Sequence, residues 1–194
     1  DMGAHPCWFP GYQKTDDAAA IEALEKEWCV TLLDLDRECT DVADLLRRKA
    51  IKVAVVLGED PFGTPDLPEE LRAGLEAVDL LIAADVVDTA TTRAADVVLP
   101  LSATAETSGT FTNQERRVQR FRRAVAPRPG METWQLLCEL AARLGLRFKM
   151  KYAGIDAVTE EIRRVVPMYR EVVVDSPDAD GTWDLSRFPL PRRP

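Results

Sequence analysis

Acidic side chains follow two short apolar runs, and these positions have the clearest capacity for chemistry in the chain. Gly58-Glu59-Asp60-Pro61 follows the β-branched run Ile51–Leu57, and Asp85 follows Leu80–Ala84. Such runs are typical of buried strands, and α/β proteins bind ligands at the carboxyl ends of their strands. Glycine permits close approach there, and carboxylates supply hydrogen-bond acceptors. An ordinary acidic turn also explains Gly-Glu-Asp-Pro by itself, and Asp85 could simply cap the turn that follows it.

The elements that must position these acids form a repeated pattern. Ile51–Leu57 is predicted to be the best central strand, Pro65–Glu76 a helix, and Leu80–Ala84 a second strand. This order predicts a right-handed crossover in a parallel sheet. The chain has no Gly-x-Gly-x-x-Gly sequence, so a nicotinamide dinucleotide is not suggested. The predicted fold is therefore α/β, a Rossmann-like three-layer unit with a mainly parallel sheet.

The stretch after Asp85 contains a third apolar run. Thr89–Ala95 is small and polar, and Val97–Leu99 is predicted to be another short buried strand, stopped by Pro100. Small residues at strand ends leave room for a ligand at the edge of the sheet. Beyond Pro100 the chain is rich in hydroxyl side chains, with Gly109 suited to a tight approach.

Helical spacing and capping residues predict further helices, and a high content of Gly, Pro and Asp predicts irregular ends. The helices are Ala18–Trp28 capped by Asp16 or Asp17, a short one ending at Lys49 and capped by Thr40 or Asp41, Glu132–Leu144 stopped by Gly145, and Ile155–Val166. The irregular ends are Met2–Gln13 and Glu171–Pro194. The short helix is amphipathic and is expected to pack on a sheet.

Composition places the chain among globular proteins. It has 194 residues, of which 46% are hydrophobic and 30% charged, and this length suffices for one domain with a core. The net charge of -8 argues against nucleic acid as a partner, because no excess of Lys and Arg is present. No apolar run approaches the length needed to span a membrane.

No catalytic constellation is visible among the residues. The cysteines Cys7, Cys29, Cys39 and Cys138 form no Cys-x-x-Cys pair, so neither a zinc site nor an iron–sulfur cluster is predicted. They are expected to be free thiols of an intracellular protein, with Cys138 buried on a helix. The single histidine, His5, is interpreted as a structural side chain of a loop.

Several longer motifs carry a resemblance to a known family. The sequences ADVVLP (95–100), AETSGTFTNQERRVQR (105–120) and METWQLLCELAARLG (131–145) resemble the large catalytic subunits of the molybdopterin oxidoreductase family. DMGAHPCWFPGYQ (1–13) and VLGEDP (56–61) are most similar to the formate dehydrogenase branch of that family. The resemblance implies a molybdopterin guanine dinucleotide, carrying molybdenum or tungsten, as the cofactor.

The resemblance also implies which residues bind this cofactor. A guanine base presents an N1–H and an amino group together, and a carboxylate is its natural bidentate acceptor. Guanine-nucleotide affinity is therefore expected to depend on Asp85 and Asp60. Of the arginines between residues 116 and 128, Arg116 and Arg117 are favoured as phosphate contacts, and the others are expected to be solvated or paired with acids. The implied cofactor-binding residues are Gly58, Glu59, Asp60, Pro61, Ala84, Asp85, Thr89, Glu106, Thr107, Gly109, Asn113 and Glu132.

The same resemblance implies that the chain is a middle piece of a larger enzyme. The family's cluster cysteines, metal ligand and catalytic residues precede this segment, so no catalytic residue or metal ligand is expected here, Cys7 included. Residues 1–150 are interpreted as the cofactor-binding segment, and residues 151–194 as a helix and a loose tail. The sheet is then expected to be incomplete without the rest of the subunit. Expected partners are the other domains of that subunit and iron–sulfur electron-transfer subunits, in the cytoplasm.

Formate oxidation to carbon dioxide, a two-electron reaction, is the activity that the resemblance implies for the whole enzyme. Another molybdopterin oxidoreductase, such as a nitrate reductase, is an alternative of the same class. A non-catalytic structural homologue, as in the large iron–sulfur subunit of NADH–quinone oxidoreductase, is an alternative of a different class. Gly58-Glu59-Asp60 and Asp85 favour cofactor binding over this last alternative.

Overall fold

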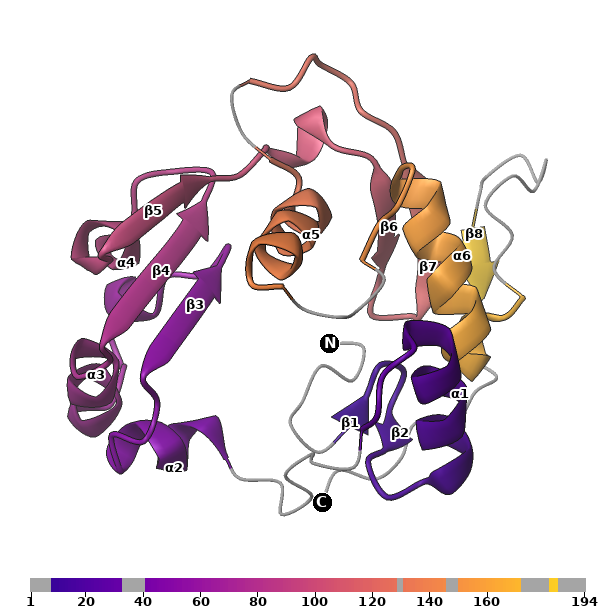
Figure 1. The fold of residues 1–194 in the computed structure, drawn as a ribbon. Coiled ribbons are helices and arrows are strands. Elements are labelled where there is room, and N and C mark those ends of the chain that lie inside the picture. The colour runs from indigo at the N-terminus through magenta and orange to yellow at the C-terminus, as the bar shows by residue number, and fades with distance from the viewer. Residues whose placement is uncertain (1–7, 33–40, 129–130, 146–149, 172–181, 185–194) are drawn as a thin grey trace. The chain divides into compact units, whose positions relative to one another are not determined.

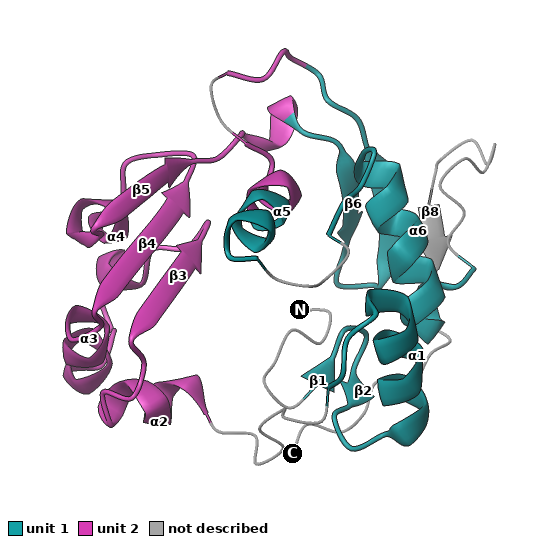
Figure 2. Cartoon of the chain, viewed as in Figure 1, with its two compact units in different colours: residues 1–39, 107–124, 137–194 teal, residues 40–106, 125–136 magenta. Residues whose placement is uncertain are grey.

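The computed structural model describes residues 8–32, 41–128, 131–145, 150–171 and 182–184 (Figure 1). The chain divides into two compact units, which Figure 2 shows in different colours. Unit 1 contains residues 1–39, 107–124 and 137–194, and unit 2 contains residues 40–106 and 125–136. Each unit is therefore assembled from stretches that are far apart in the sequence.

Unit 2 is built on a parallel sheet with β4 in its centre (Figure 1). The strand order is β3 (Val53–Leu57), β4 (Leu80–Asp85) and β5 (Val97–Pro100), and both neighbouring pairs are parallel. Helix α3 (Glu69–Glu76) connects β3 to β4, and α4 (Ala90–Ala94) connects β4 to β5. Parallel strands need such crossover connections. The predicted α/β fold with a parallel sheet is confirmed, while the Rossmann-like three-layer arrangement stays a prediction.

The position and burial of the strands differ from the prediction. The run Ile51–Leu57 forms β3 at an edge of the described sheet, whereas β4 pairs on both sides. The third run is not buried as predicted, since Val97 is 40% and Val98 52% exposed. Neighbouring side chains of a strand point to opposite faces, so both faces of β5 are open. A β-branched run favours a strand but does not reveal how many neighbours that strand has.

Two helices of unit 2 are shorter than predicted. Helix α2 (Val42–Arg47) is capped by the Asp41 side chain, one of the two predicted caps. It ends before Lys49, whose φ of 52° is not helical. Helix α3 begins at Glu69, directly after Pro68, because proline disfavours helical conformation in the residue that precedes it. The main neighbour of α2 is α3 rather than the sheet.

Helices α2 and α3 approach each other closely at Gly74. A Cβ atom at this position would meet the backbone carbonyl group of Leu46, with its carbon 2.7 Å away. Backbone cannot rotate aside, so we expect Gly74→Ala to destabilise this pair by about 1–3 kcal/mol. That cost exceeds the gain in helix propensity, which is at most about 1 kcal/mol.

Hydrogen exchange of the α2 and α3 amides in the purified protein measures the effect of Gly74→Ala. Gly154→Ala is the matched control, since its Cβ would meet nothing within 4 Å and its backbone is extended. Faster exchange of α2 and α3 is expected only in the Gly74 variant. Unchanged exchange there would show that the two helices separate without cost.

Unit 1 packs two helices against an antiparallel sheet. Helices α1 (Ala18–Trp28) and α6 (Ile155–Val165) contact each other, and the strand order of the sheet is β6 (Gly109–Thr112), β7 (Arg117–Phe121) and β8 (Thr182–Asp184). Buried side chains from both helices and β7 form one core cluster. Its members are Phe9, Ala20, Leu24, Val118, Val165, Val166 and Met168.

Polar contacts fix the ends of α1. Asp17, one of the two predicted caps, accepts a hydrogen bond from the Ala19 N–H at 2.9 Å. At the other end, the Trp28 Nε1–H donates to Glu161 of α6 at 2.9 Å. Helix α6 begins at Ile155 as predicted and ends one residue early, with Val166 as its C-cap. The start of α1 agrees with the sequence because its cap is local.

Both predicted irregular ends contain a short strand. β1 (Trp8–Phe9) pairs with β2 (Gln13–Lys14), and β8 pairs with β7 within the predicted tail. β7 lies far from β8 in the sequence, and local composition does not reveal such a pairing, whereas β1 and β2 are each only two residues long. Residues 1–7, 33–40, 172–181 and 185–194 lie outside the described part of the chain, and the predictions for His5, Cys7 and Cys39 with them.

Helix α5 (Thr133–Arg143) crosses the boundary between the units. Its buried residues are Leu136 and Ala141, whereas Leu137 and Leu144 are exposed, although helical spacing predicts that both share an apolar face with Ala141. Adjacent apolar residues in this segment make two overlapping stripes, and spacing alone does not choose between them. The residue that follows, Gly145, has a φ of 64°, in agreement with the predicted stop.

Candidate functional site at the carboxyl edge of the parallel sheet

The carboxyl ends of β3 and β4 lie side by side in unit 2. Leu57 and Ala84 are register partners, and the Gly58 N–H donates to the Ala84 carbonyl oxygen at 2.8 Å. Gly58 has a φ of 63°, and nothing lies within 4 Å of the position that a Cβ would take. Glycine thus permits the turn and leaves open space over the strand ends.

Glu59 and Asp85 supply acceptor oxygens at this edge. Glu59 is exposed and has no hydrogen-bond or ion-pair partner within the described part of the chain. Asp85 Oδ1 accepts from the Val86 N–H at 2.6 Å and the Val87 N–H at 3.3 Å, so Asp85 does cap the turn that follows it. Its Oδ2 accepts no hydrogen bond from the described residues. That oxygen can therefore receive a ligand's donor.

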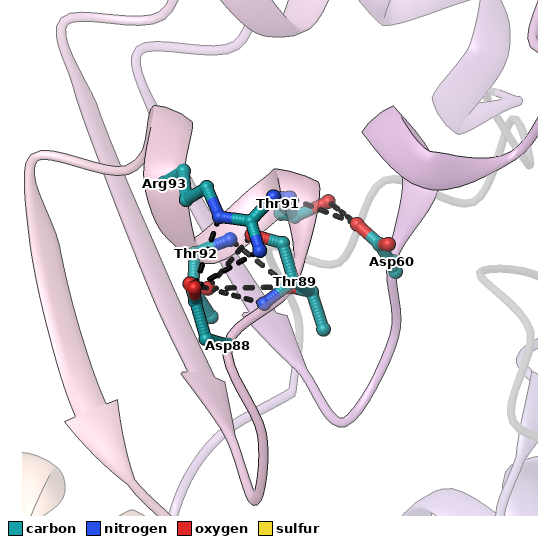
Figure 3. A network of polar contacts seen from close by, with 6 residues as sticks. All are labelled: Asp60, Asp88, Thr89, Thr91, Thr92 and Arg93. Carbon is teal, nitrogen blue, oxygen red and sulfur yellow. Dashed lines mark hydrogen bonds and ion pairs between the residues drawn. The ribbon is translucent and has the colours of Figure 1, made fainter.

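Asp60 is engaged inside unit 2, at the start of the 3-10 turn η1 (Pro61–Gly63). Its Oδ1 accepts from the Thr91 hydroxyl at 2.6 Å and the Thr91 N–H at 2.8 Å (Figure 3). It also accepts from the Gly63 N–H at 3.2 Å. Thr91 is fully buried, and its hydroxyl accepts from the Phe62 N–H at 3.1 Å. These hydrogen bonds, that of the Thr91 hydroxyl foremost, lower the pKa of Asp60 because they stabilise its charged form.

Helix α4 begins next to Asp60, where the sequence indicated only a small polar stretch. Thr89 and Thr92 cap it reciprocally: the Thr92 N–H donates to Thr89 Oγ1 at 3.1 Å, and the Thr89 N–H donates to Thr92 Oγ1 at 2.8 Å. Arg93 Nε donates to Asp88 at 3.0 Å (Figure 3). The Thr-x-x-Thr spacing was the available signal for this cap. The Thr89 hydroxyl, a predicted cofactor contact, is thus part of a helix cap.

Two further predicted acids of unit 2 order the chain around them. The Glu106 carboxylate accepts from the Ala103 N–H at 3.0 Å and the Arg128 N–H at 3.2 Å. Glu132 accepts from the Trp134 Nε1–H at 2.9 Å, next to the start of α5. A local structural role therefore accounts for the contacts that both carboxylates make in the described structure.

The remaining predicted residues, Thr107, Gly109 and Asn113, lie in unit 1. Gly109 begins β6, where the Phe121 ring lies 3.3 Å from the position of a Cβ atom. Asn113 Oδ1 accepts from the Arg117 N–H at 2.9 Å in the turn between β6 and β7. Gly109 and Asn113 thus shape this hairpin.

Arg117 and Arg120, which follow Asn113, form ion pairs with nearby acids. Arg120 lies 2.9 Å from Asp156, as predicted for the arginines beyond the first two. Arg117 lies 3.4 Å from Glu115, and both side chains are more than half exposed. Exposed pairs of this kind are weak, so Arg117 keeps the capacity to bind an anion.

Metal-binding and thiol chemistry have little support among the described residues. No group of three or more His, Cys, Asp or Glu side chains in these ranges could hold a metal ion. Cys29 and Cys138 are free thiols, and Cys138 is half-buried rather than buried. Burial raises the pKa of the Cys138 thiol, with Glu139 and Glu161 adding to the shift, which lowers its reactivity.

In the described ranges of the chain, no helix has the length and apolar character to cross a bilayer.

The sequence of this chain matches a known protein family. Residues 17–143 match the family model described as molybdopterin oxidoreductase, and this range includes the strand ends and their acids. The chain belongs to the molybdopterin oxidoreductase family. The resemblance carried by the sequence motifs is confirmed.

Relatives within the molybdopterin oxidoreductases include proteins named as formate dehydrogenases. The chain is 38% identical to the F420-dependent formate dehydrogenase subunit alpha of Methanocaldococcus jannaschii, over 93% of this chain and 27% of that protein. It is 36% identical to formate dehydrogenase H of Escherichia coli, over 86% of this chain and 24% of that protein. It is also 34% identical to the NADPH-Fe(3+) oxidoreductase subunit alpha of Geobacter sulfurreducens, over 89% and 20%. The chain thus spans about a quarter of the length of these relatives.

Proposed function

We propose that this chain holds the guanine end of a molybdopterin guanine dinucleotide within a formate dehydrogenase-like catalytic subunit. The observation that carries the proposal is the sheet edge beside the open space over Gly58, where Glu59 and Asp85 have acceptor oxygens without a partner among the described residues. The adjacent N1–H and amino donors of guanine match such acceptors. The donor and acceptor chemistry of this edge therefore fits the cofactor.

In this proposal the residues of the chain bind and orient the cofactor, and the cofactor supplies the chemistry. Glu59 and Asp85 accept hydrogen bonds from the base, while Gly58 and Ala84 permit its close approach. When bound, the cofactor's molybdenum or tungsten supplies two-electron redox chemistry. The other proposed contacts, with the base or with the rest of the dinucleotide, are Pro61, Thr89, Glu106, Thr107, Gly109, Asn113 and Glu132.

The proposed reaction of the whole protein is the oxidation of formate to carbon dioxide, or its reverse, at a bis-pterin centre. Relatives named as formate dehydrogenase alpha subunits support this choice of substrate. The proposed partners are the remaining domains of the same subunit and iron–sulfur subunits that carry the electrons away, in the cytoplasm.

Purification of the full-length protein without oxygen tests the proposal. Molybdenum or tungsten, pterin, guanosine monophosphate released by acid hydrolysis and formate oxidation are measured on one preparation. Metal, guanine nucleotide and formate turnover together are the expected result. Guanine nucleotide without formate turnover would leave the binding role and contradict the formate assignment.

A different electron-transfer reaction is the second candidate, because one relative is named as an NADPH-Fe(3+) oxidoreductase. A nitrate reductase-like activity belongs to the same class. Assays with NADPH and ferric iron, and with nitrate, on the same preparation distinguish these activities from formate oxidation. Fully matured protein without metal, pterin or guanine nucleotide would instead favour a non-catalytic homologue.

A further inference from the structure

We infer that Asp60 is a positioning residue: it clamps the end of β3 to α4 and thereby fixes the guanine-binding edge, without itself contacting the base. This inference rests on the proposed function and gives Asp60 a role other than the direct contact that the sequence predicts. The pair Asp60 and Thr91 is called the clamp below.

The clamp joins two connections that are far apart in the sequence. Asp60 follows β3, and Thr91 lies in α4, 31 residues later. Asp60 Oδ1 accepts hydrogen bonds from the hydroxyl and N–H of Thr91 and from the Gly63 N–H. The Thr91 hydroxyl, which is fully buried, links the same carboxylate to the Phe62 N–H. Figure 3 shows the Asp60 side chain directed toward Thr91.

The clamp influences the position of Asp85 through the short segment that joins β4 to α4. Asp85 is held at one side by the sheet, since its carbonyl oxygen accepts from the Leu101 N–H at 2.9 Å. At the other side, α4 is anchored by the clamp and by the reciprocal Thr89–Thr92 cap. Releasing the clamp frees one end of this segment. A binding group needs a fixed support of this kind to keep its geometry within fractions of an ångström.

The Asp60 carboxylate also packs closely against Gly63. A Cβ atom at residue 63 would lie 2.6 Å from the Cγ atom of Asp60 and closer still to its Oδ2. The carboxylate therefore rests on the glycine of its own turn. This packing limits the space beside Oδ2 and favours an internal role for Asp60 over contact with a base.

Asparagine at residue 60 separates the two roles. Its amide oxygen can take the place of Oδ1 and accept the same hydrogen bonds, although bonds to a neutral amide are weaker than bonds to a carboxylate. Its amino group would take the position of Oδ2. If Oδ2 accepted hydrogen bonds from a guanine base, this amino group would place a donor against the donors of the base and weaken binding. A clamp predicts that Asp60→Asn keeps the guanine nucleotide. Direct recognition of the base by Asp60 predicts that this variant loses the guanine nucleotide.

The experiment uses full-length protein carrying Asp60→Asn, Asp60→Ala, Thr91→Val or Thr91→Ser, with Asp66→Asn as an exposed acidic control. Guanosine monophosphate released per protein and hydrogen exchange of the Thr91 amide are measured for each. Wild-type levels are expected for Asp60→Asn, Thr91→Ser and the control. About tenfold less nucleotide is expected for Asp60→Ala and Thr91→Val, which remove buried hydrogen bonds. The Thr91 amide should exchange faster in Asp60→Ala.

Two results would overturn the inference: nucleotide loss in Asp60→Asn equal to that in Asp60→Ala, or full nucleotide retention in Thr91→Val. Failure of the proposed function has a different signature, since the wild-type protein would then release no guanine nucleotide. In that case the exchange of the Thr91 amide still tests the clamp. Protection in Asp60→Asn and its loss in Asp60→Ala would support it, and equal exchange in both would refute it.

Discussion

Replacement of Asp85 by asparagine is expected to weaken retention of guanine nucleotide by about 10- to 100-fold. A hydrogen bond to a charged group contributes about 1.5–3 kcal/mol, and each 1.4 kcal/mol corresponds to a factor of about ten in affinity. The asparagine oxygen can still accept from the Val86 and Val87 N–H groups, so the turn after β4 should be preserved. Its amino group would face the donors of the base.

Two measurements on the full-length protein test this effect: guanosine monophosphate released per protein, and hydrogen exchange of the β4 amides as a check on the fold. Asp66→Asn removes an exposed acid of the same unit without touching the sheet edge and is the matched control. Loss of nucleotide with unchanged β4 exchange is expected for Asp85→Asn alone. Full retention of nucleotide in that variant would exclude Asp85 as an acceptor for the base.

Truncation of Leu24 is expected to give the largest loss of stability in unit 1. Its side chain is fully buried in the cluster that joins α1, β7 and α6. Removing a buried leucine side chain loses its transfer free energy and leaves a cavity, which together cost about 2–5 kcal/mol. We therefore expect Leu24→Ala to lower the free energy of local unfolding of α1 by about this amount.

Native-state hydrogen exchange of the α1 amides measures that free energy in the intact protein. Glu22→Ala, at an exposed position of the same helix, controls for the change of helix propensity. It is expected to shift the unfolding free energy by no more than about 0.5 kcal/mol. A similar small shift for Leu24→Ala would mean that the cluster does not hold α1 in place.

The two aspartates at the sheet edge, Asp60 and Asp85, have different surroundings. Both carboxylates follow parallel strands, and from the sequence each fits guanine equally well. In the structure, Asp60 is bonded through Oδ1 to a buried threonine, while Asp85 uses Oδ1 for two exposed N–H groups, and its Oδ2 has no partner among the described residues. The surroundings, and not the residue type, therefore decide which acid has an oxygen available for a ligand.

Features that depend on neighbouring residues could be predicted from the sequence. Asp17 and Asp41 cap the helices that follow them, and Leu80–Asp85 is a strand that ends in an acid. Caps and short apolar runs are local, because a few consecutive residues supply both the hydrogen bonds and the apolar surface. The motifs that carried the family resemblance are local in the same sense.

The way in which these elements combine became visible in the three-dimensional fold. The fold made β4 the central strand, paired β8 with β7, and brought Asp60 to Thr91 across 31 residues. It also assigned Thr107 to a different compact unit from Asp85. Such choices depend on which surfaces bury each other and which buried polar groups find partners. Contacts between distant residues settle them, and no local pattern of residues encodes those contacts.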